Sequence, residues 1–259
     1  MATETYQAIQ VERQEAVHSI VLNKPPLNIL DIGMIEEVSD ALVAVEDDAT
    51  VRIVVFRGAG EKAFCAGVSI QDHTPDRIRL MIPRFHNVFR LLARTDKVTV
   101  AAVRGHCLGG GLELALMCDL VVATEDAQMG QPEIKLGQLP PVGIILLPYL
   151  IGYRRAAELL LTGRSIGARE AQLLGLVNRV VPDGDLTRGL EELLGELTAQ
   201  SGAALRMTKR LMRRVSGLDF ERLLRESEEF FLEDVVETAD AKEGILAFLE
   251  KRAPHWKHR

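Results

Sequence analysis

The sequence has few cysteines, and their placement excludes a disulfide framework. Cys65, Cys107 and Cys118 lie in apolar segments, and no two of them have metal-ligand spacing. An odd, sparse set of this kind indicates free thiols in a reducing compartment. The six histidines show no ligand spacing either, so we expect no metal site.

Long apolar runs and an excess of positive charge are also missing. No stretch of 18 uncharged apolar residues occurs, so we expect no membrane association. The first residues, Met-Ala-Thr-Glu-Thr, lack the basic and apolar leader of an exported protein, and we expect a cytoplasmic location. A net charge of -6 disfavours a nucleic-acid partner. The 259 residues, 47% of them apolar, are enough for one large core with a helical appendage.

A strand–glycine–helix pattern stands at the centre of the chain. Residues 98–103 predict a buried strand, and Gly105 and residues 109–111 then lead into an apolar helix. Such a junction presents unpaired backbone N–H groups and the positive end of a helix dipole, which stabilise anionic oxygen. Cys107 stands where the dinucleotide fingerprint needs glycine, and no Lys follows Gly110 as a phosphate loop requires. The pattern therefore favours an oxyanion formed during a reaction.

Glu113 is the one acid inside that apolar helix. A buried, unpaired carboxylate is costly, and burial raises its pKa. Two interpretations stay open: a structural carboxyl satisfied by Arg or backbone, and a general acid/base beside an oxyanion hole. Glu133 follows 20 residues later, and alone it would be explained as an acid in the helical turn after Pro132.

Residues 163–167 match the Gly-x-Ser-x-Gly nucleophile pattern. That motif needs a strand before it and a helix after it. Residues 156–161 have helical propensity, so we interpret Ser165 as part of a turn. Gly167 is expected to cap the helix that contains Glu170.

Alternating strands and helices over residues 1–190 predict an α/β fold, and the pattern alone leaves open whether the sheet is flat or spiral. In the C-terminal tail, residues 221–251, charged and apolar residues alternate at helical spacing, which indicates a lid or a subunit contact. The expected strands are residues 16–22, 51–56, 98–103, 119–124 and 176–181. The expected helices are residues 33–46, 76–94 and the whole chain after about residue 186, with a loop at residues 128–137.

Three separated motifs resemble the crotonase, or enoyl-CoA hydratase/isomerase, superfamily. They are AFCAGVSI at residues 63–70, GHCLGGGLE at residues 105–113 and GQPEIKLG at residues 130–137. The resemblance implies a crotonase-like ββα spiral core over residues 1–190. It also implies a helical C-terminal region, residues 191–259, that covers the site and contacts other subunits in a homotrimer or a dimer of trimers.

The resemblance further implies a coenzyme A thioester substrate, with coenzyme A as part of the substrate and no other cofactor. The backbone N–H groups of Val68 and Gly110 would form the oxyanion hole, and Glu113 and Glu133 would be the acid/base pair. The remaining contacts that the resemblance implies are Ala66, Ser69, Ile70, Phe248 and Lys251 for coenzyme A, and Pro141 and His73 for the acyl pocket.

Two carboxyl groups around one water suit hydration better than double-bond isomerisation, which needs one base. Thioester hydrolysis stays open, because it needs only water aimed at the carbonyl carbon. A non-catalytic scaffold with a protein or RNA partner is a further alternative, which the presence of both acids disfavours. Lys209, Arg210, Arg213 and Arg214 could serve RNA, but we interpret them as a solvated helix face.

Within the superfamily, residues 26–31, 67–76 and 247–256 resemble the cyclohexa-1,5-dienecarbonyl-CoA hydratases. These enzymes hydrate the cyclic diene formed from benzoyl-CoA during anaerobic aromatic degradation. Three residues depart from the common hydratase pattern: Ser69 replaces Asp, Gln71 replaces a Lys that often supports coenzyme A, and Pro141 replaces glycine. These departures count against a linear substrate more than against the acid/base pair.

Overall fold

Over residues 6–259, the part of the chain that this computed structural model describes, the strands form two sheets. Only the β1–β2 pair is antiparallel in the larger sheet, and the strands after it are parallel. In sheet order the larger sheet contains β1 (Ile9–Gln14), β2 (Val17–Leu22), β3 (Ile53–Gly58), β5 (Val98–Val103), β7 (Leu120–Thr124) and β10 (Arg179–Val181). The smaller sheet contains β4 (Ala63–Cys65), β6 (His106–Leu108), β8 (Gln128–Gly130) and β9 (Ser165–Gly167).

The chain visits the two sheets in turn, which produces a ββα repeat. A strand of the larger sheet is followed by a strand of the smaller sheet and then by a helix. The successive units are β3–β4–α2, β5–β6–α3 and β7–β8–α4, with α2 at Ile78–Arg94, α3 at Gly110–Met117 and α4 at Pro141–Ile151. The predicted spiral α/β architecture is therefore confirmed.

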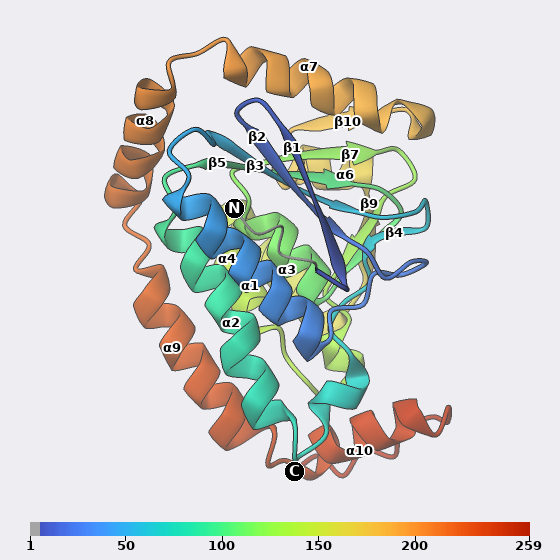
Figure 1. Cartoon of the computed structure of the whole chain (residues 1–259). Coiled ribbons are helices and arrows are strands. Elements are labelled where there is room, and N and C mark those ends of the chain that lie inside the picture. Colours follow the sequence, from blue (N-terminus) through green and yellow to red (C-terminus); the bar gives the residue numbers. More distant parts are fainter. Residues whose placement is uncertain (1–5) are drawn as a thin grey trace.

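Alternating side chains give the larger sheet two apolar faces, because successive residues of a strand point to opposite sides. In β3, Val54 and Phe56 belong to the main core with α1 (Ile32–Asp47) and α2. Ile53 and Val55 pack toward α7 (Leu186–Thr198) in a second, smaller core. Figure 1 shows α1 and α2 side by side and α7 running across the opposite side of the sheet.

Helices make up most of the chain after the core. In the C-terminal part, α9 packs beside α2, and the last helix, α10, contacts the short turn η2. The remaining helices are α5 (Tyr153–Thr162), α6 (Ala168–Leu174), α8 (Gly202–Val215), α9 (Phe220–Phe230) and α10 (Ala239–Leu249); the short turns are η1 (Ile70–His73), η2 (Glu133–Leu136), η3 (Asp183–Asp185) and η4 (Phe231–Val235). None of the helices described within residues 6–259 is both long and apolar enough to cross a membrane.

Most sequence-based elements are confirmed. The strand at residues 98–103 is β5 with the same bounds, and α2 continues through Pro83. The loop expected at residues 128–137 was wrong, because it contains β8 and η2. The helical tail ends at Leu249, so residues 250–259 are not helical as expected.

The edge strand β1 was not predicted, because its apolar alternation is limited to Ile9 and Val11 and five of its six residues are exposed. The division of the chain at residue 190 stays a prediction.

Candidate active site

A cavity of about 650 Å³ lies between the loop after β4, the start of α3, the turn η2 and α10. Its walls include nine of the eleven residues predicted for the site, from distant parts of the sequence. They are Ala66, Val68, Ile70, His73, Gly110, Glu113, Glu133, Pro141 and Phe248. Ser69 and Lys251 are not among the residues that line it within the described chain; the buried Ser69 hydroxyl donates to Gln71 Oε1 at 3.1 Å. The roles of these two residues in coenzyme A binding stay predictions.

Glycines bring the two expected oxyanion loops together. Gly67 and Gly109 have φ values of +115° and +52°, which other residues rarely adopt. A methyl group added to Gly109 would stand 2.6 Å from Glu133 Oε1, and one added to Gly110 would stand 2.6 Å from Val68 Cγ2. The absence of side chains here lets the Glu133 carboxyl lie against the start of α3.

The backbone around Val68 is fixed by its neighbours. The Leu30 N–H donates to Gly67 O at 3.0 Å, and the Ser69 N–H donates to Leu30 O at 2.8 Å. Within residues 6–259, the N–H groups of Val68 and Gly110 have no hydrogen-bond partner. Both residues line the cavity, so two preorganised donors are available to an oxyanion.

Glu113 is anchored by the first turn of α4. Its side chain is buried, and its Oε1 accepts the N–H groups of Val142 at 2.9 Å and Gly143 at 2.8 Å. Pro141, the first residue of α4, has no N–H to add. Burial raises the pKa of Glu113, while the two N–H donors act against that rise. The carboxyl group is therefore held in one orientation at a helix N-terminus.

Glu133 is the first residue of η2, and the residue as a whole is partly buried. Burial raises its pKa well above the ordinary value, and the negative charge of Glu113 raises it further. The buried Gln131 side chain lies 3.1 Å from both Glu133 oxygens, and its amide nitrogen donates in the orientation that satisfies both. The two acids thus interact, and the pair favours a shared proton over two charges.

Sequence reasoning missed Gln131. It stands two residues before Glu133 in the third motif, but an isolated Gln in one sequence carries no periodicity or ligand spacing. Its closeness to Glu133 becomes visible only once β8 and η2 are folded.

His73 is placed as a neutral group in the cavity wall. Its Nδ1 lies 2.8 Å from Ser69 O, and burial lowers its pKa. Its neutral imidazole therefore contributes to the shape of the pocket and adds no positive charge to it.

A family model described as enoyl-CoA hydratase/isomerase matches residues 12–259. The chain belongs to this family. A relative from Mycobacterium bovis, named a probable enoyl-CoA hydratase, is 39% identical over 98% of this chain and 100% of its own length. Cyclohexa-1,5-dienecarbonyl-CoA hydratase from Thauera aromatica is 34% identical over 97% of this chain and 96% of its own length.

The solved structure of an enoyl-CoA hydratase from Mycobacterium avium subsp. paratuberculosis superposes with a TM-score of 0.88. Its identity is 26%, and the match covers 98% of this chain and 100% of that one. The resemblance that the three motifs predicted is therefore confirmed.

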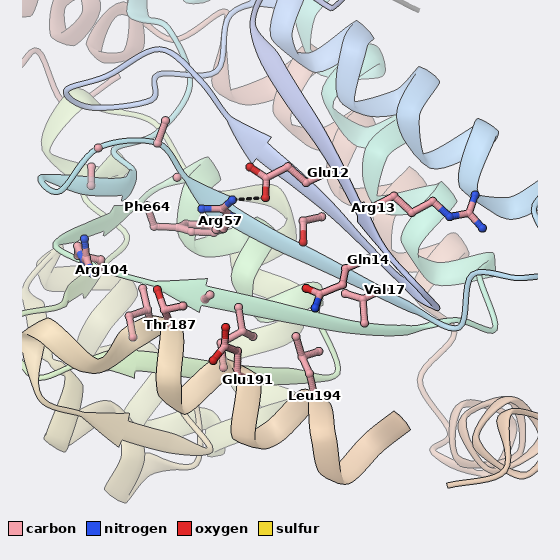
Figure 2. A pocket seen from close by; sticks show the side chains of 18 residues that line it. Glu12, Arg13, Gln14, Val17, Arg57, Phe64, Arg104, Thr187, Glu191 and Leu194 are labelled. Atoms are coloured by element: carbon pink, nitrogen blue, oxygen red, sulfur yellow. Dashed lines mark hydrogen bonds and ion pairs between the residues drawn. The ribbon is translucent and has the colours of Figure 1, made fainter. Parts of the chain in front are cut away.

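A second cavity, of about 550 Å³, lies between the larger sheet and α7. Figure 2 shows Arg57 paired with Glu12 on the sheet, with Thr187, Glu191 and Leu194 on the helix opposite. None of the eleven residues predicted for the site lines this cavity. Nine of them line the first cavity, which is therefore the candidate active site.

Ser165 lies outside both cavities. The helix α5 precedes it, as expected, and Ser165 itself begins the short strand β9. Gly167 is the N-cap residue of α6. The strand–nucleophile–helix arrangement of a hydrolase is thus missing at this motif.

The expected solvated basic face was wrong for Lys209. This side chain is buried, its Nζ pairs with Asp119 at 2.6 Å, and it donates to Lys97 O at 2.6 Å. Arg210 and Arg213 both pair with Asp96. Arg210 and Arg214 are exposed, as expected for a solvated helix face.

Proposed function

We propose that the chain is a hydro-lyase that adds water to an α,β-unsaturated acyl-CoA thioester, with cyclohexa-1,5-diene-1-carbonyl-CoA as its substrate. Membership of the enoyl-CoA hydratase/isomerase family supports the reaction type. The observation that carries the proposal is the pair Glu113 and Glu133 in one cavity, beside the unpaired N–H groups of Val68 and Gly110.

The different surroundings of the two acids assign them different roles. Glu113, with two N–H donors on one oxygen, is the better carboxylate and takes a proton from water. The water oxygen bonds to the β-carbon of the thioester, and the electron pair moves onto the carbonyl oxygen. Glu133, whose pKa is raised by burial and by Glu113, holds a proton and gives it to the enolate. The proton that Glu113 has gained then returns to Glu133, directly or through solvent.

The oxyanion donors supply the main stabilisation of that enolate. The N–H groups of Val68 and Gly110 are fixed before substrate arrives, so little reorganisation is needed as charge develops. Removing one such donor typically costs ~3 kcal/mol of transition-state stabilisation in other enzymes. Because both donors are backbone groups, the thioester carbonyl has to lie against the glycine loops.

The ring assignment rests on the wall near Glu133. Pro141 occupies the first position of α4, and the next two N–H groups are used by Glu113. The start of α4 consequently offers no donor to a water molecule, and a rigid proline ring faces the cavity instead. A flat, stiff acyl ring loses less freedom than a flexible chain in such a pocket. The named hydratase from Thauera aromatica, at 34% identity, supports the same substrate.

Isomerisation and hydrolysis are the enzymatic alternatives. An isomerase needs one mobile base, whereas both carboxyl groups here are held in the same cavity. A hydrolase would need a nucleophile or water aimed at the thioester carbon, and the two N–H donors together with both acids favour conjugate addition. A scaffold without activity gives no reason for two mutually repelling acids in a cavity.

We also propose a homotrimer or a dimer of trimers as the working assembly. Phe248 lines the cavity although its side chain is 54% exposed, and Lys251 lies just beyond it in the sequence. In that assembly, Lys251 would contact coenzyme A bound to a neighbouring subunit.

The test of the substrate is kcat/KM for cyclohexa-1,5-diene-1-carbonyl-CoA and crotonyl-CoA on one preparation of protein. We expect the cyclic thioester to be hydrated with the higher kcat/KM. A clear preference for crotonyl-CoA would leave the hydratase reaction in place and overturn the ring assignment.

A further inference from the structure

The last helix, α10, packs directly on the turn that carries Glu133. A methyl group added to Gly244 of α10 would overlap the carbonyl group of Leu136 and stand 3.0 Å from its Cα. Leu136 is the last residue of η2, and Glu133 is the first. Because the obstructing atoms are backbone, no side-chain rotation can relieve such an overlap.

A second glycine, Gly137, allows η2 and α10 to approach closely at another point. Gly137 ends η2 with φ +65°, and a methyl group there would stand 2.6 Å from Asp240 O in the first turn of α10. Gly137 also donates its N–H to Ile134 O at 3.1 Å. One end of η2 is therefore in backbone contact with α10 at two points.

Contacts within residues 238–255 hold α10 and the segment after it in one shape. Thr238 caps α10 by accepting the Ala241 N–H at 3.0 Å, and Glu243 pairs with Arg252 at 2.5 Å. Glu243 also accepts the His255 N–H at 2.7 Å, which ties the following tail back to α10. By contrast, η2 is a single turn whose first residue has no side-chain cap. Because η2 is the element that α10 mainly packs against, extra volume at the contact has to move η2 and α10 apart.

We propose that Gly244 is a positioning residue for Glu133, acting through η2. The absence of a side chain at Gly244 sets how closely η2 approaches α10, and so where the Glu133 carboxyl stands relative to Gly109 and Glu113. This inference rests on the proposed acid role of Glu133. It adds that the C-terminal helix is part of the apparatus that orients the proton donor, beyond any contact with coenzyme A.

The test is a double-mutant cycle between Gly244→Ala and Glu133→Gln, read as kcat on the better of the two thioesters. Alone, Gly244→Ala is expected to lower kcat at least ~10-fold, since small misplacements of catalytic groups have large effects. In the Glu133→Gln background it should lower kcat by less than ~2-fold, because the group it positions is already gone. The pH profile of kcat should also shift in Gly244→Ala, as the interaction between the two carboxyl groups changes.

Gly195→Ala is the matched control. Gly195 lies in α7, and a methyl group added there has nothing within 4 Å. This variant should retain the wild-type kcat and pH profile in both backgrounds, with a melting temperature that is no lower, because Ala is favoured over Gly inside a helix.

Thr238→Ala is a milder variant of the same contact, useful if Gly244→Ala folds poorly. It removes the cap of α10 and leaves the cavity wall intact. Its loss of kcat should also disappear in the Glu133→Gln background.

The outcomes separate this inference from the proposed function. Full activity of Glu133→Gln alone would overturn the acid assignment and the inference together. A reduced kcat in Glu133→Gln that Gly244→Ala lowers further by the same factor as in the wild type, or an unchanged kcat in Gly244→Ala, would overturn only the positioning role.

Discussion

Glu113 and Glu133 differ in what their carboxyl groups contact. Glu113 has two backbone donors from α4, whereas Glu133 has a neutral amide, Gln131, and the nearby charge of Glu113. Glu113 could be identified from sequence because an acid among apolar helical neighbours is unusual. Glu133 was ambiguous alone, and Gln131 was invisible, because their meaning comes from contacts between segments that fold together.

Replacing either acid should impair turnover. Glu113→Gln and Glu133→Gln are each expected to lower kcat at least ~10²-fold, the typical contribution of a positioned proton-transfer group. The fold should persist, since Gln has nearly the same volume. Steady-state kinetics with circular dichroism of both variants checks this. Turnover near the wild-type level in both would contradict the acid/base assignment.

Glu133→Gln should also change stability with pH. Burial and the charge of Glu113 raise the folded-state pKa of Glu133, so above an unfolded pKa of ~4.3 the native state retains a proton that the unfolded chain releases. Wild-type stability is consequently lost as pH rises from that value through the folded pKa. The variant lacks the Glu133 contribution to this loss, while Glu113, whose pKa is also raised by burial, still contributes.

Melting temperatures of both proteins between pH 4 and pH 8.5 test the expectation. The variant should match the wild type near pH 4 and melt at a higher temperature at neutral pH. The difference should be roughly 2–4 °C for each kcal/mol by which the substitution raises the free energy of unfolding. If the variant melts below the wild type at pH 8 while the two match at pH 4, burial and the charge of Glu113 do not raise the pKa of Glu133.

At the scale of elements, long periodic segments were predictable and short ones were not. The strand β5 and the helices α1 and α2 have strong apolar patterns, which sequence reasoning located within a few residues. The three-residue strand β8 and the single turn η2 are too short for any period to appear. They are stabilised by pairing with β6 and β9 and by contact with α10, which are long-range interactions.

Removing residues 245–259 should impair substrate binding and assembly. The deletion takes away part of α10 together with the cavity-lining Ala247, Phe248, Arg252 and Pro254. We expect KM for the acyl-CoA to rise about tenfold, in line with ~1.4 kcal/mol of lost contacts, and the assembly to become smaller.

Kinetics and light scattering of the truncated protein measure both effects. The Gly195→Ala variant, whose changed residue lies in α7 and lines neither cavity, is the control. An unchanged KM and unchanged mass after the longer deletion would remove the tail from the binding site.

At the scale of the whole molecule, the two sheets explain why distant motifs form one site. The second strand of each ββα unit belongs to the smaller sheet. Because β4, β6 and β8 are parallel neighbours in that sheet, the segments that follow these strands lie next to one another. Val68 lies in the segment after β4, Gly110 and Glu113 lie in the first turn of α3 after β6, and Glu133 begins η2 after β8. The sequence predicted an α/β fold, but only the family resemblance predicted this spiral order, since the strands of the smaller sheet are three residues long.

The most direct test of the account is the fate of oxygen during turnover in water enriched in oxygen-18. Purified protein is incubated with the cyclic dienoyl-CoA, and the products are analysed by mass spectrometry beside those of the Glu113→Gln and Glu133→Gln variants. The account predicts an intact CoA thioester that has gained one water with one oxygen-18 atom, at a rate at least ~10²-fold lower in each variant. Free coenzyme A with oxygen-18 in the released acid, or an isomerised thioester without it, would contradict hydration by the Glu113–Glu133 pair.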